Sequence, residues 1–239
     1  MALYGGESGH HIEAMRDAVR MLRELRVPFA LIGAHAVAMN VKEHRSTDDI
    51  DVVAPSEHMP LVRQRSVEFG FIEQPKDAEA MVRTFRHRSG GRLDIIFDDS
   101  GGFANLDAVQ MVDLSGVGEI PVAAPLDIAY AKLRTQRRDW VRQEEKRVVD
   151  FADLVSMLRE NPELARDLDE RISLPARTDA KESPHLIDMV IKLREACIQA
   201  GIAPPRSKTR THVLVLAVLV VLLAVSAIVW ITWVLSRSS

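Results

Sequence analysis

The sequence has few features that would indicate its location or partners by composition alone. It contains one cysteine, Cys197, which excludes a disulfide within the chain and agrees with a reducing compartment. Its formal net charge of -3 gives no overall attraction to nucleic acid, so any basic surface must be local. Residues 1–16 have no apolar stretch, so we expect no secretory signal there.

One long apolar run contrasts with this composition. Residues 213–235 are 23 consecutive positions without a charge, about 35 Å as a helix, which can cross a hydrocarbon core of about 30 Å. The alternative is a buried core helix, but the length favours a membrane span, and Trp230 and Trp233 suit its interface. Three cations precede the run and one follows it: Arg206, Lys208 and Arg210, then Arg237. This bias predicts a single-pass, tail-anchored membrane protein whose large N-terminal part lies in the cytoplasm.

The rest of the chain alternates helical and strand patterns, which predicts an α+β fold with a small mixed sheet. Strand-like runs occupy residues 28–33, 48–54, 81–87 and 92–98. Helical patterns occupy residues 11–25, 34–41, 56–70, 125–160 (one bent helix or two) and 185–201. We expect four parts: an α+β core at 1–124, a helical part at 125–170, a linker with a juxtamembrane amphipathic helix at 171–212, and the span at 213–235. That amphipathic helix could pack on the domain or lie along the bilayer.

Carboxylates interrupt two of the predicted strands. In "DDIDVVA" Asp49 and Asp51 share one face of the strand, while Asp48 points the other way. Asp94 in "RLDIIF" repeats the arrangement, and if the two strands are neighbours the three carboxylates meet. A solvated strand edge is the simpler interpretation. A converging set would repel itself unless a divalent cation neutralised it, and Mg²⁺ prefers such hard oxygen ligands.

A glycine upstream of these carboxylates favours the functional interpretation. In "FALIGAHAVAMN" a predicted strand runs into Gly33 and then into the start of a helix. The first amides of a helix are unpaired donors that favour an anion, and glycine lets a phosphate approach the backbone. The sequence therefore combines a possible phosphate site with a possible metal site about fifteen residues later.

These motifs carry a resemblance to a known family. The run "LIGAHAVAMNVKEHRSTDDIDVV" resembles the minimal nucleotidyltransferase fold, which includes DNA polymerase beta, and is more closely similar to the AbiEii-type toxin branch. Five positions match that branch's R-x-T-x-D-I-D run: Arg45, Thr47, Asp49, Ile50 and Asp51. Asp94 takes the place of the family's third carboxylate, and three positions match its later helices: Lys132, Asp150 and Asp153. The resemblance covers about residues 8–160.

The resemblance implies a nucleotidyltransferase-like α+β fold and a magnesium-dependent transfer of a nucleoside monophosphate from an NTP. By that pattern Asp49 and Asp51 hold the ion that grips the triphosphate, and with Asp94 they hold a second ion that activates the acceptor hydroxyl. Asp94 would be the general base. Gly33-Ala34 departs from the usual Gly-Gly or Gly-Ser pair, because alanine supplies no hydroxyl to a phosphate.

The resemblance leaves several partners open. The acceptor would be RNA or a protein side chain, the anchor implies contact with membrane lipid, and membership of the toxin branch implies a cognate antitoxin protein. Two alternatives are a small-molecule, antibiotic-modifying transferase and a degenerate nucleotide-binding scaffold at the membrane. The carboxylates favour an enzyme, and Ala34 favours the scaffold.

The candidate nucleotide-binding residues are those near the glycine turn and one lysine: Gly33, Ala34, His35, Arg45, Thr47 and Lys132. His35 could touch a phosphate or serve local packing, and Arg45 could meet the triphosphate or pair with Asp48. Lys132 lies in a basic cluster with Arg134, Arg137 and Arg138, which could bind phosphates, RNA or lipid, or form a solvated helix face. For Asp150 and Asp153, neighbours on one helix, the favoured role is to anchor basic residues.

Overall fold

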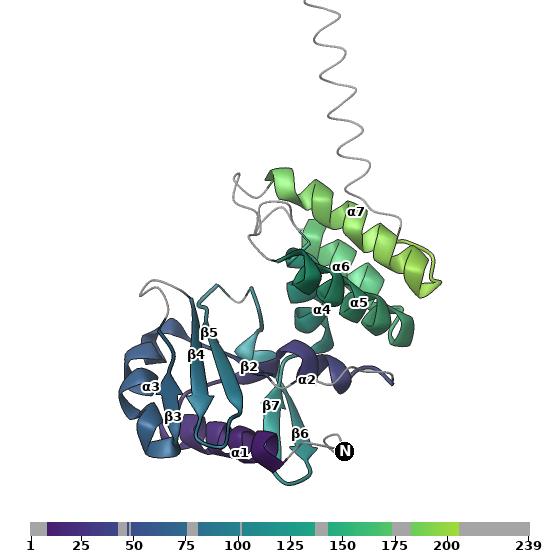
Figure 1. The fold of residues 1–239 in the computed structure, drawn as a ribbon. Coiled ribbons are helices and arrows are strands. Elements are labelled where there is room, and N and C mark those ends of the chain that lie inside the picture. Colours follow the sequence, from purple (N-terminus) through teal and green to yellow (C-terminus); the bar gives the residue numbers. More distant parts are fainter. Residues whose placement is uncertain are drawn as a thin grey trace, which may run out of the picture.

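A mixed sheet forms the N-terminal half of the protein. The computed structural model describes residues 9–42, 47, 49–75, 81–100, 102–136, 143–173 and 183–205. Its seven strands lie in the order β3-β4-β5-β2-β1-β7-β6 (Figure 1). Their bounds are β1 Ala30–Ile32, β2 Asp49–Ala54, β3 Phe71–Glu73, β4 Val82–His87, β5 Arg92–Phe97, β6 Gln110–Leu114 and β7 Gly118–Val122. The pairs β2–β5 and β1–β7 are parallel and the other pairs are antiparallel.

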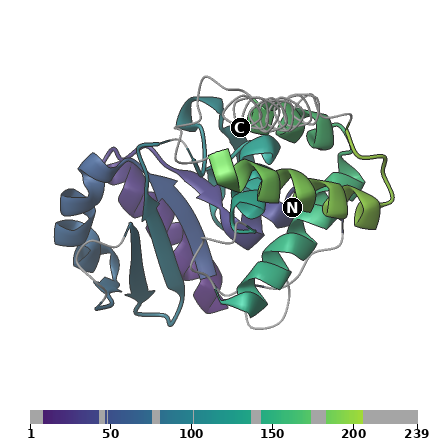
Figure 2. The same ribbon diagram turned by 90° about the horizontal axis from the view of Figure 1, so that it is seen from above.

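Helices flank this sheet and form a separate layer beside it. The described helices are α1 Gly9–Glu24, α2 Gly33–Ala38, α3 Met59–Arg65, α4 Pro125–Arg134, α5 Glu144–Glu160, α6 Leu164–Ser173 and α7 Ser183–Ala200. Short 3-10 turns occupy Ser56–His58, Ser66–Phe69 and Leu106–Ala108. The helices α4 to α7 gather into one group beside the sheet, and α2 contacts both the sheet and this group (Figures 1 and 2).

Strand alternation gives the sheet two different faces. On β5 the side chains of Leu93, Ile95 and Phe97 are buried in the hydrophobic core, next to which α1 packs. The space beside Gly91 is filled by Ala14 of α1, which shows how closely this helix approaches the start of β5. The other face of β5 carries Arg92, Asp94 and Ile96.

The four strands predicted from the sequence are present, and three more extend the sheet. Strand β3 has three residues, and β6 is largely exposed, so neither carries a strong apolar alternation. Strand β7 includes Gly118 and Pro121, and glycine and proline are more common in turns than in strands. The sheet is therefore larger than expected.

The helical half also differs in detail from the prediction. The pattern at 125–160 resolves into α4 and α5, and the following α6, which was not predicted, runs into the expected linker as far as Ser173. The amphipathic helix at 185–201 is confirmed as α7, followed by Gly201 at φ 75°. It packs on α5 and α6 and buries Met189, Leu193 and Cys197, which settles its placement in favour of the domain.

Within the described residues, no helix combines the length and the hydropathy that a membrane crossing needs. The predicted span at 213–235 lies outside the described residues, as do the cations that flank it, so this prediction stays untested.

The packing of α7 yields a first prediction. Leu193→Ala should lower the free energy of unfolding by about 2–5 kcal/mol, because Leu193 is 1% exposed and its loss leaves a cavity against α5 and α6. Ile198→Ala is the matched control: its side chain is 68% exposed, and we expect a change within about 0.5 kcal/mol. Urea unfolding of the full chain in detergent, followed by circular dichroism, measures both. Equal effects would contradict the docking of α7.

Candidate functional site

Two paired strands place four charged side chains in a square on one face of the sheet. In the parallel pairing of β2 with β5, Asp49 lies beside Arg92 and Asp51 lies beside Asp94. Residues two apart on a strand share a face, and directly paired residues point to the same side. The structure therefore places Asp49, Asp51 and Asp94 on one face of two neighbouring strands, and it adds Arg92, which was not among the predicted site residues.

Gly33 makes room for one of these carboxylates. It follows β1 directly, and Ile32 pairs with Asp51 across the sheet. A Cβ on Gly33 would lie 2.7 Å from the Cβ and Cγ atoms of Asp51, closer than real contacts allow. Its φ of 69° also falls in the left-handed region that favours glycine. In this structure Gly33 therefore accommodates the Asp51 side chain, which the sequence reasoning about phosphate access did not anticipate.

Arg92 binds two of the three aspartates. Its Nε and Nη2 atoms donate to Oδ1 and Oδ2 of Asp94 at 3.2 and 2.6 Å, and Nη1 lies 3.5 Å from Oδ2 of Asp49. Partial burial by itself would lower the pKa of Arg92. The hydrogen bond to Asp94, with the charges of Asp94, Asp49 and Asp51, outweighs burial and raises the pKa of Arg92 above its ordinary value. Arg92 is therefore a permanent cation among these carboxylates.

A cavity of about 480 Å³ opens above this square of charges. Seven of the predicted site residues line it: Gly33, Ala34, Thr47, Asp49, Asp51, Asp94 and Lys132. Beyond Asp94 on the same face, Ile96 pairs with Val82, and Phe103 and Ile128 complete an apolar part of the wall. Helix α5 contributes polar residues to the lining: Glu145, Lys146 and Asp150. The cavity thus joins a carboxylate end to an apolar stretch.

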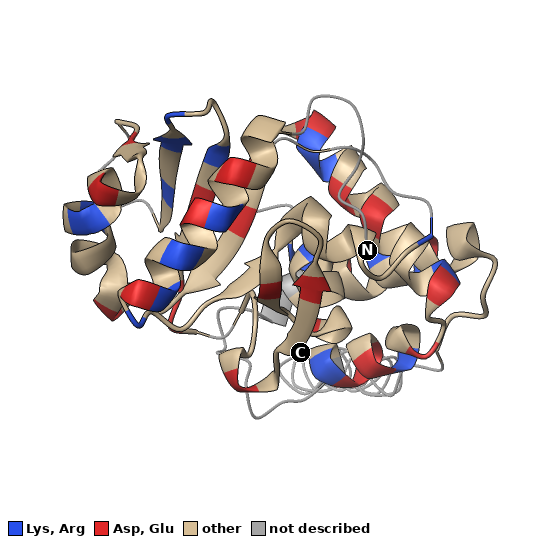
Figure 3. Cartoon of the chain, turned by 90° about the horizontal axis from the view of Figure 1, so that it is seen from below, with Lys and Arg blue, Asp and Glu red and all other residues tan. Residues whose placement is uncertain are grey.

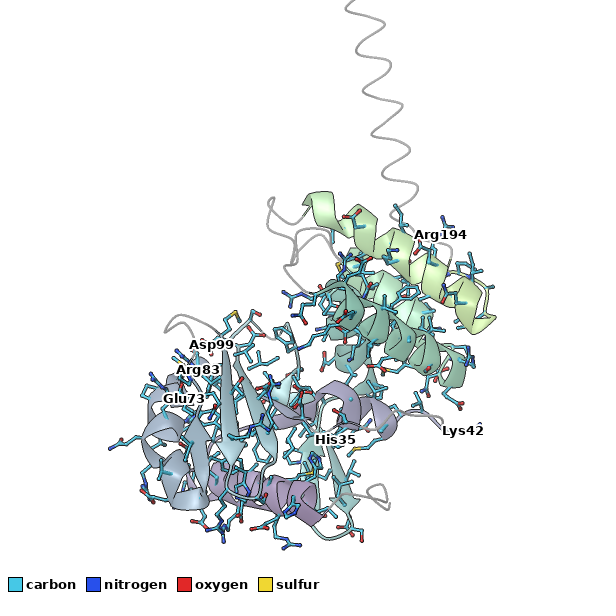
Figure 4. The ribbon with its side chains drawn as sticks, in the orientation of Figure 1. His35, Lys42, Glu73, Arg83, Asp99 and Arg194 are labelled. Atoms are coloured by element: carbon cyan, nitrogen blue, oxygen red, sulfur yellow. The ribbon has the colours of Figure 1, made fainter. Side chains whose placement is uncertain are left out.

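The remaining predicted residues have different surroundings. Thr47 accepts a hydrogen bond from the Asp49 amide through Oγ1 at 3.4 Å. His35 is not among the residues that line the cavity. It lies between α2 and α1, where its ring stacks on His11 with the two Nε2 atoms 2.8 Å apart (Figure 4). This position favours the packing role over the phosphate contact. Arg45 and Asp48 lie outside the described residues.

Lys132 is held in an ion cluster between α4 and α5. Its Nζ atom donates to Oδ1 of Asp150 at 2.7 Å and to Oδ2 of Asp153 at 2.8 Å, and all three side chains are nearly buried. The anchoring role favoured for Asp150 and Asp153 is therefore confirmed. Lys132 also borders the cavity, so this cluster joins the helical layer to the site.

A second cluster lies on the opposite face of the sheet. The carboxylate and imidazole atoms of Glu13, Asp17 and His87 all lie within 4.8 Å of one another. Among the described residues, the three aspartates at the cavity do not all lie within that distance of one another. Acidic and basic residues alternate along α1 here (Figure 3). Asp17 contacts His87 at 3.1 Å and also two arginines, Arg20 and Arg88. Because cations already neutralise it, we interpret this cluster as a packing element.

The chemistry of the cleft donors fits magnesium. Asp49, Asp51 and Asp94 supply carboxylate oxygens, the hard ligands that Mg²⁺ prefers. With Arg92 as the one cation in the square, two negative charges remain, which a divalent ion would balance. Asp49 is exposed enough to exchange ligands, while the side chain of Asp94 is 12% exposed. These three residues are the ones that would hold the ion.

Arg92 and the apolar wall are the parts that sequence reasoning missed. Arg92 carries a signal, because "RLD" puts it two residues before Asp94 and hence on the same face. An arginine at the start of a strand is more commonly a surface charge, so the signal is weak. Val82, Phe103 and Ile128 come from three separate segments and meet only through the tertiary fold.

Sequence comparison with known proteins finds one partial match. No model of a known protein family matches the chain. A protein of Roseiflexus castenholzii that is named for nickel insertion is 29% identical over 143 residues, covering 54% of this chain and 34% of that protein. The chain therefore spans about a third of that relative's length, and the likeness concerns only a part of it.

Solved structures give a likeness over more of the chain. The antibiotic-resistance factor ANT(2'')-Ia matches with a TM-score of 0.50 at 16% identity, covering 73% of this chain and 96% of that one. The match to JHP933 from Helicobacter pylori covers 89% of this chain and 98% of that one, with 18% identity and a TM-score of 0.47. The match to ANT(2'')-Ia shows a shared fold.

The Gly33–Asp51 contact yields a second prediction. Gly33→Ala should destabilise the protein by roughly 2–4 kcal/mol, because the methyl group is strained at positive φ and displaces Asp51. Gly90→Ala is the matched control, since Gly90 has a φ of 98° but nothing within 4 Å of its Cβ position, so about 1 kcal/mol is expected. Urea unfolding compares the two. A loss at Gly33 no greater than at Gly90 would contradict this account.

The ion cluster around Lys132 yields a third prediction. Lys132→Met should lower the free energy of unfolding by about 3–5 kcal/mol, because it removes a buried cation that binds both Asp150 and Asp153. Lys42→Met removes an exposed lysine whose Nζ lies 3.2 Å from Glu160, and should change stability by less than about 1 kcal/mol. Thermal and urea unfolding measure both. A near-neutral Lys132→Met would show that the cluster does not hold α4 against α5.

Proposed function

We propose that this chain, which has the nucleotidyltransferase fold, is a magnesium-dependent nucleotidyltransferase that transfers a nucleoside monophosphate from an NTP to a hydroxyl group. The observation that carries the proposal is the in-register pairing of Asp51 with Asp94, with Asp49 on the same face and Gly33 against Asp51. That pairing gathers three carboxylates at one end of a single cavity. A solvated strand edge would not combine these carboxylates with a cavity of ligand size.

Each cleft residue has a role in this reaction. When bound, magnesium would neutralise the phosphates and lower the pKa of the acceptor hydroxyl. Asp49 and Asp51 would hold the ion that binds the triphosphate, and together with Asp94 they would hold the ion on the acceptor side. Asp94, the most buried of the four charged residues, accepts the proton of the acceptor hydroxyl. The hydroxyl oxygen can then attack the α-phosphorus in line, and pyrophosphate leaves.

The size and lining of the cavity agree with a nucleotide. A volume of about 480 Å³ falls within the range of about 300–1,000 Å³ typical of small-molecule sites. The apolar stretch of Val82, Ile96 and Phe103 suits a planar base or an apolar part of the acceptor, while the carboxylate end suits a metal-bound triphosphate. Gly33, Ala34 and Thr47 supply backbone and hydroxyl groups beside the carboxylates.

Within this function we favour a macromolecular acceptor, RNA or a protein, for an enzyme tethered to the membrane by residues 213–235 with its cleft in the cytoplasm. The tether supports this choice because it offers no evident advantage for a small diffusing acceptor, and NTPs are cytoplasmic. Membership of the toxin branch would add a cognate antitoxin. The alternative is a small-molecule acceptor, which is favoured by the fold shared with an antibiotic-resistance factor.

The fourth prediction tests the transfer itself. The full chain in detergent, given each α-labelled NTP with Mg²⁺ and either total RNA or total protein, should label one acceptor class. Asp51→Asn and Asp94→Asn should each reduce labelling at least about 100-fold, because each removes a ligand oxygen from the transfer site. Asp113→Asn is the matched control, since Asp113 is an exposed residue of β6, and it should label normally.

The outcomes separate the candidates. Label in RNA or protein that depends on Asp51 supports the proposal, and label that appears only when small aminated or hydroxylated compounds are supplied supports the small-molecule alternative. Nucleotide binding by equilibrium dialysis, without transfer to any of these acceptors, would point to the nucleotide-binding scaffold.

A further inference from the structure

Arg92 has an unusual position for a residue in a metal site. Its three nitrogen atoms cover both oxygens of Asp94 and reach one oxygen of Asp49, so it bridges two of the three carboxylates. A guanidinium that binds a carboxylate through two parallel hydrogen bonds is among the strongest side-chain pairs. The same lone pairs are the ones that a divalent cation would need.

The strand pairing fixes Arg92 in this place. It is the direct cross-strand partner of Asp49 and lies two residues before Asp94 on the same strand. Both relations are set by the backbone, so Arg92 can leave the carboxylates only by rotating its side chain. Its own side chain is 29% exposed, which leaves the guanidinium an open side toward the cavity.

We propose that Arg92 is the resident counter-ion of the three cleft aspartates, a positioning residue that orients Asp94 in the metal-free protein and competes with the divalent cation for it. The inference deepens the proposed function, on which it rests for the identity of the cation. It explains how three carboxylates coexist on one sheet face before a metal arrives, since one unit of positive charge is already among them.

The competition has a predictable size. A cation bound to Asp94 would lie about 4–5 Å from the guanidinium. The repulsion between charges of +2 and +1 at that distance corresponds to roughly twentyfold in affinity at the dielectric constant of water, and salt screening reduces it to roughly tenfold. Removing the arginine should therefore tighten metal binding, which is the opposite of what the loss of a supporting residue usually does.

The fifth prediction uses Arg92→Met, which keeps much of the side-chain volume and removes the charge. Titration of the full chain in detergent with Mn²⁺, followed by electron paramagnetic resonance of the free ion, should show affinity increased roughly tenfold. Arg92→Lys, which keeps the charge, should remain within about threefold of the unaltered protein. Arg86→Met is the matched control: Arg86 is the cross-strand neighbour of Arg92 on β4, but its guanidinium donates to the Gly90 carbonyl oxygen at 3.1 Å, and its loss should change affinity less than about twofold.

Thermal unfolding with and without saturating Mn²⁺ distinguishes this role from simple packing. The metal-free Arg92→Met variant should melt at a lower temperature than the unaltered protein, and Mn²⁺ should stabilise the variant more. A variant that loses the same stability in both conditions, or whose Mn²⁺ affinity is unchanged or weaker, overturns the proposal. If the Mn²⁺ affinity changes as predicted but no nucleotidyl transfer is detected, the role of Arg92 as counter-ion stands and only the proposed reaction is contradicted.

Discussion

The parallel, in-register pairing of β2 with β5 is the constraint on which the site depends. These strands are distant in sequence, and a shift of one residue would turn Asp94 to the core face and Leu93 to the cavity. The register is held by the apolar residues at the alternate positions, among them Ile50, Val52 and Ile95, each no more than 2% exposed. The hydrophobic core therefore positions the carboxylates, although no carboxylate belongs to it.

Charge balance is the second condition for this arrangement. Three aspartates on one face of the sheet would repel one another. Arg92 lies among them and reduces this repulsion, and Gly33 leaves space for the Asp51 side chain. Lys132 serves the helical layer in a comparable way, since it forms ion pairs with Asp150 and Asp153 where α4 and α5 meet at the cavity. The sheet and the helical layer thus each contribute a paired set of charges to the same cleft.

Much of this arrangement could be predicted from the sequence, because the relevant patterns are local. The alternation in "DDIDVVA" determines which aspartates share a face, and the break at Gly33 follows from its place between a strand and a helix. The pairing of Asp51 with Asp94 could be predicted only from the family resemblance, because the sequence of neither strand shows which strands are neighbours in the sheet. Three features were beyond local reasoning: the burial of His35 against His11, the apolar wall around Phe103, and the outer strands β6 and β7, whose sequences carry weak alternation.

The most direct test is diffraction from crystals of the full chain grown with Mn²⁺ and a non-hydrolysable NTP analogue, with data collected at the manganese absorption edge. The account predicts anomalous peaks between the triphosphate and the side chains of Asp49, Asp51 and Asp94, with the Arg92 guanidinium moved off at least one Asp94 oxygen. A nucleotide bound away from these aspartates, or manganese found only beside Glu13, Asp17 and His87, would contradict it.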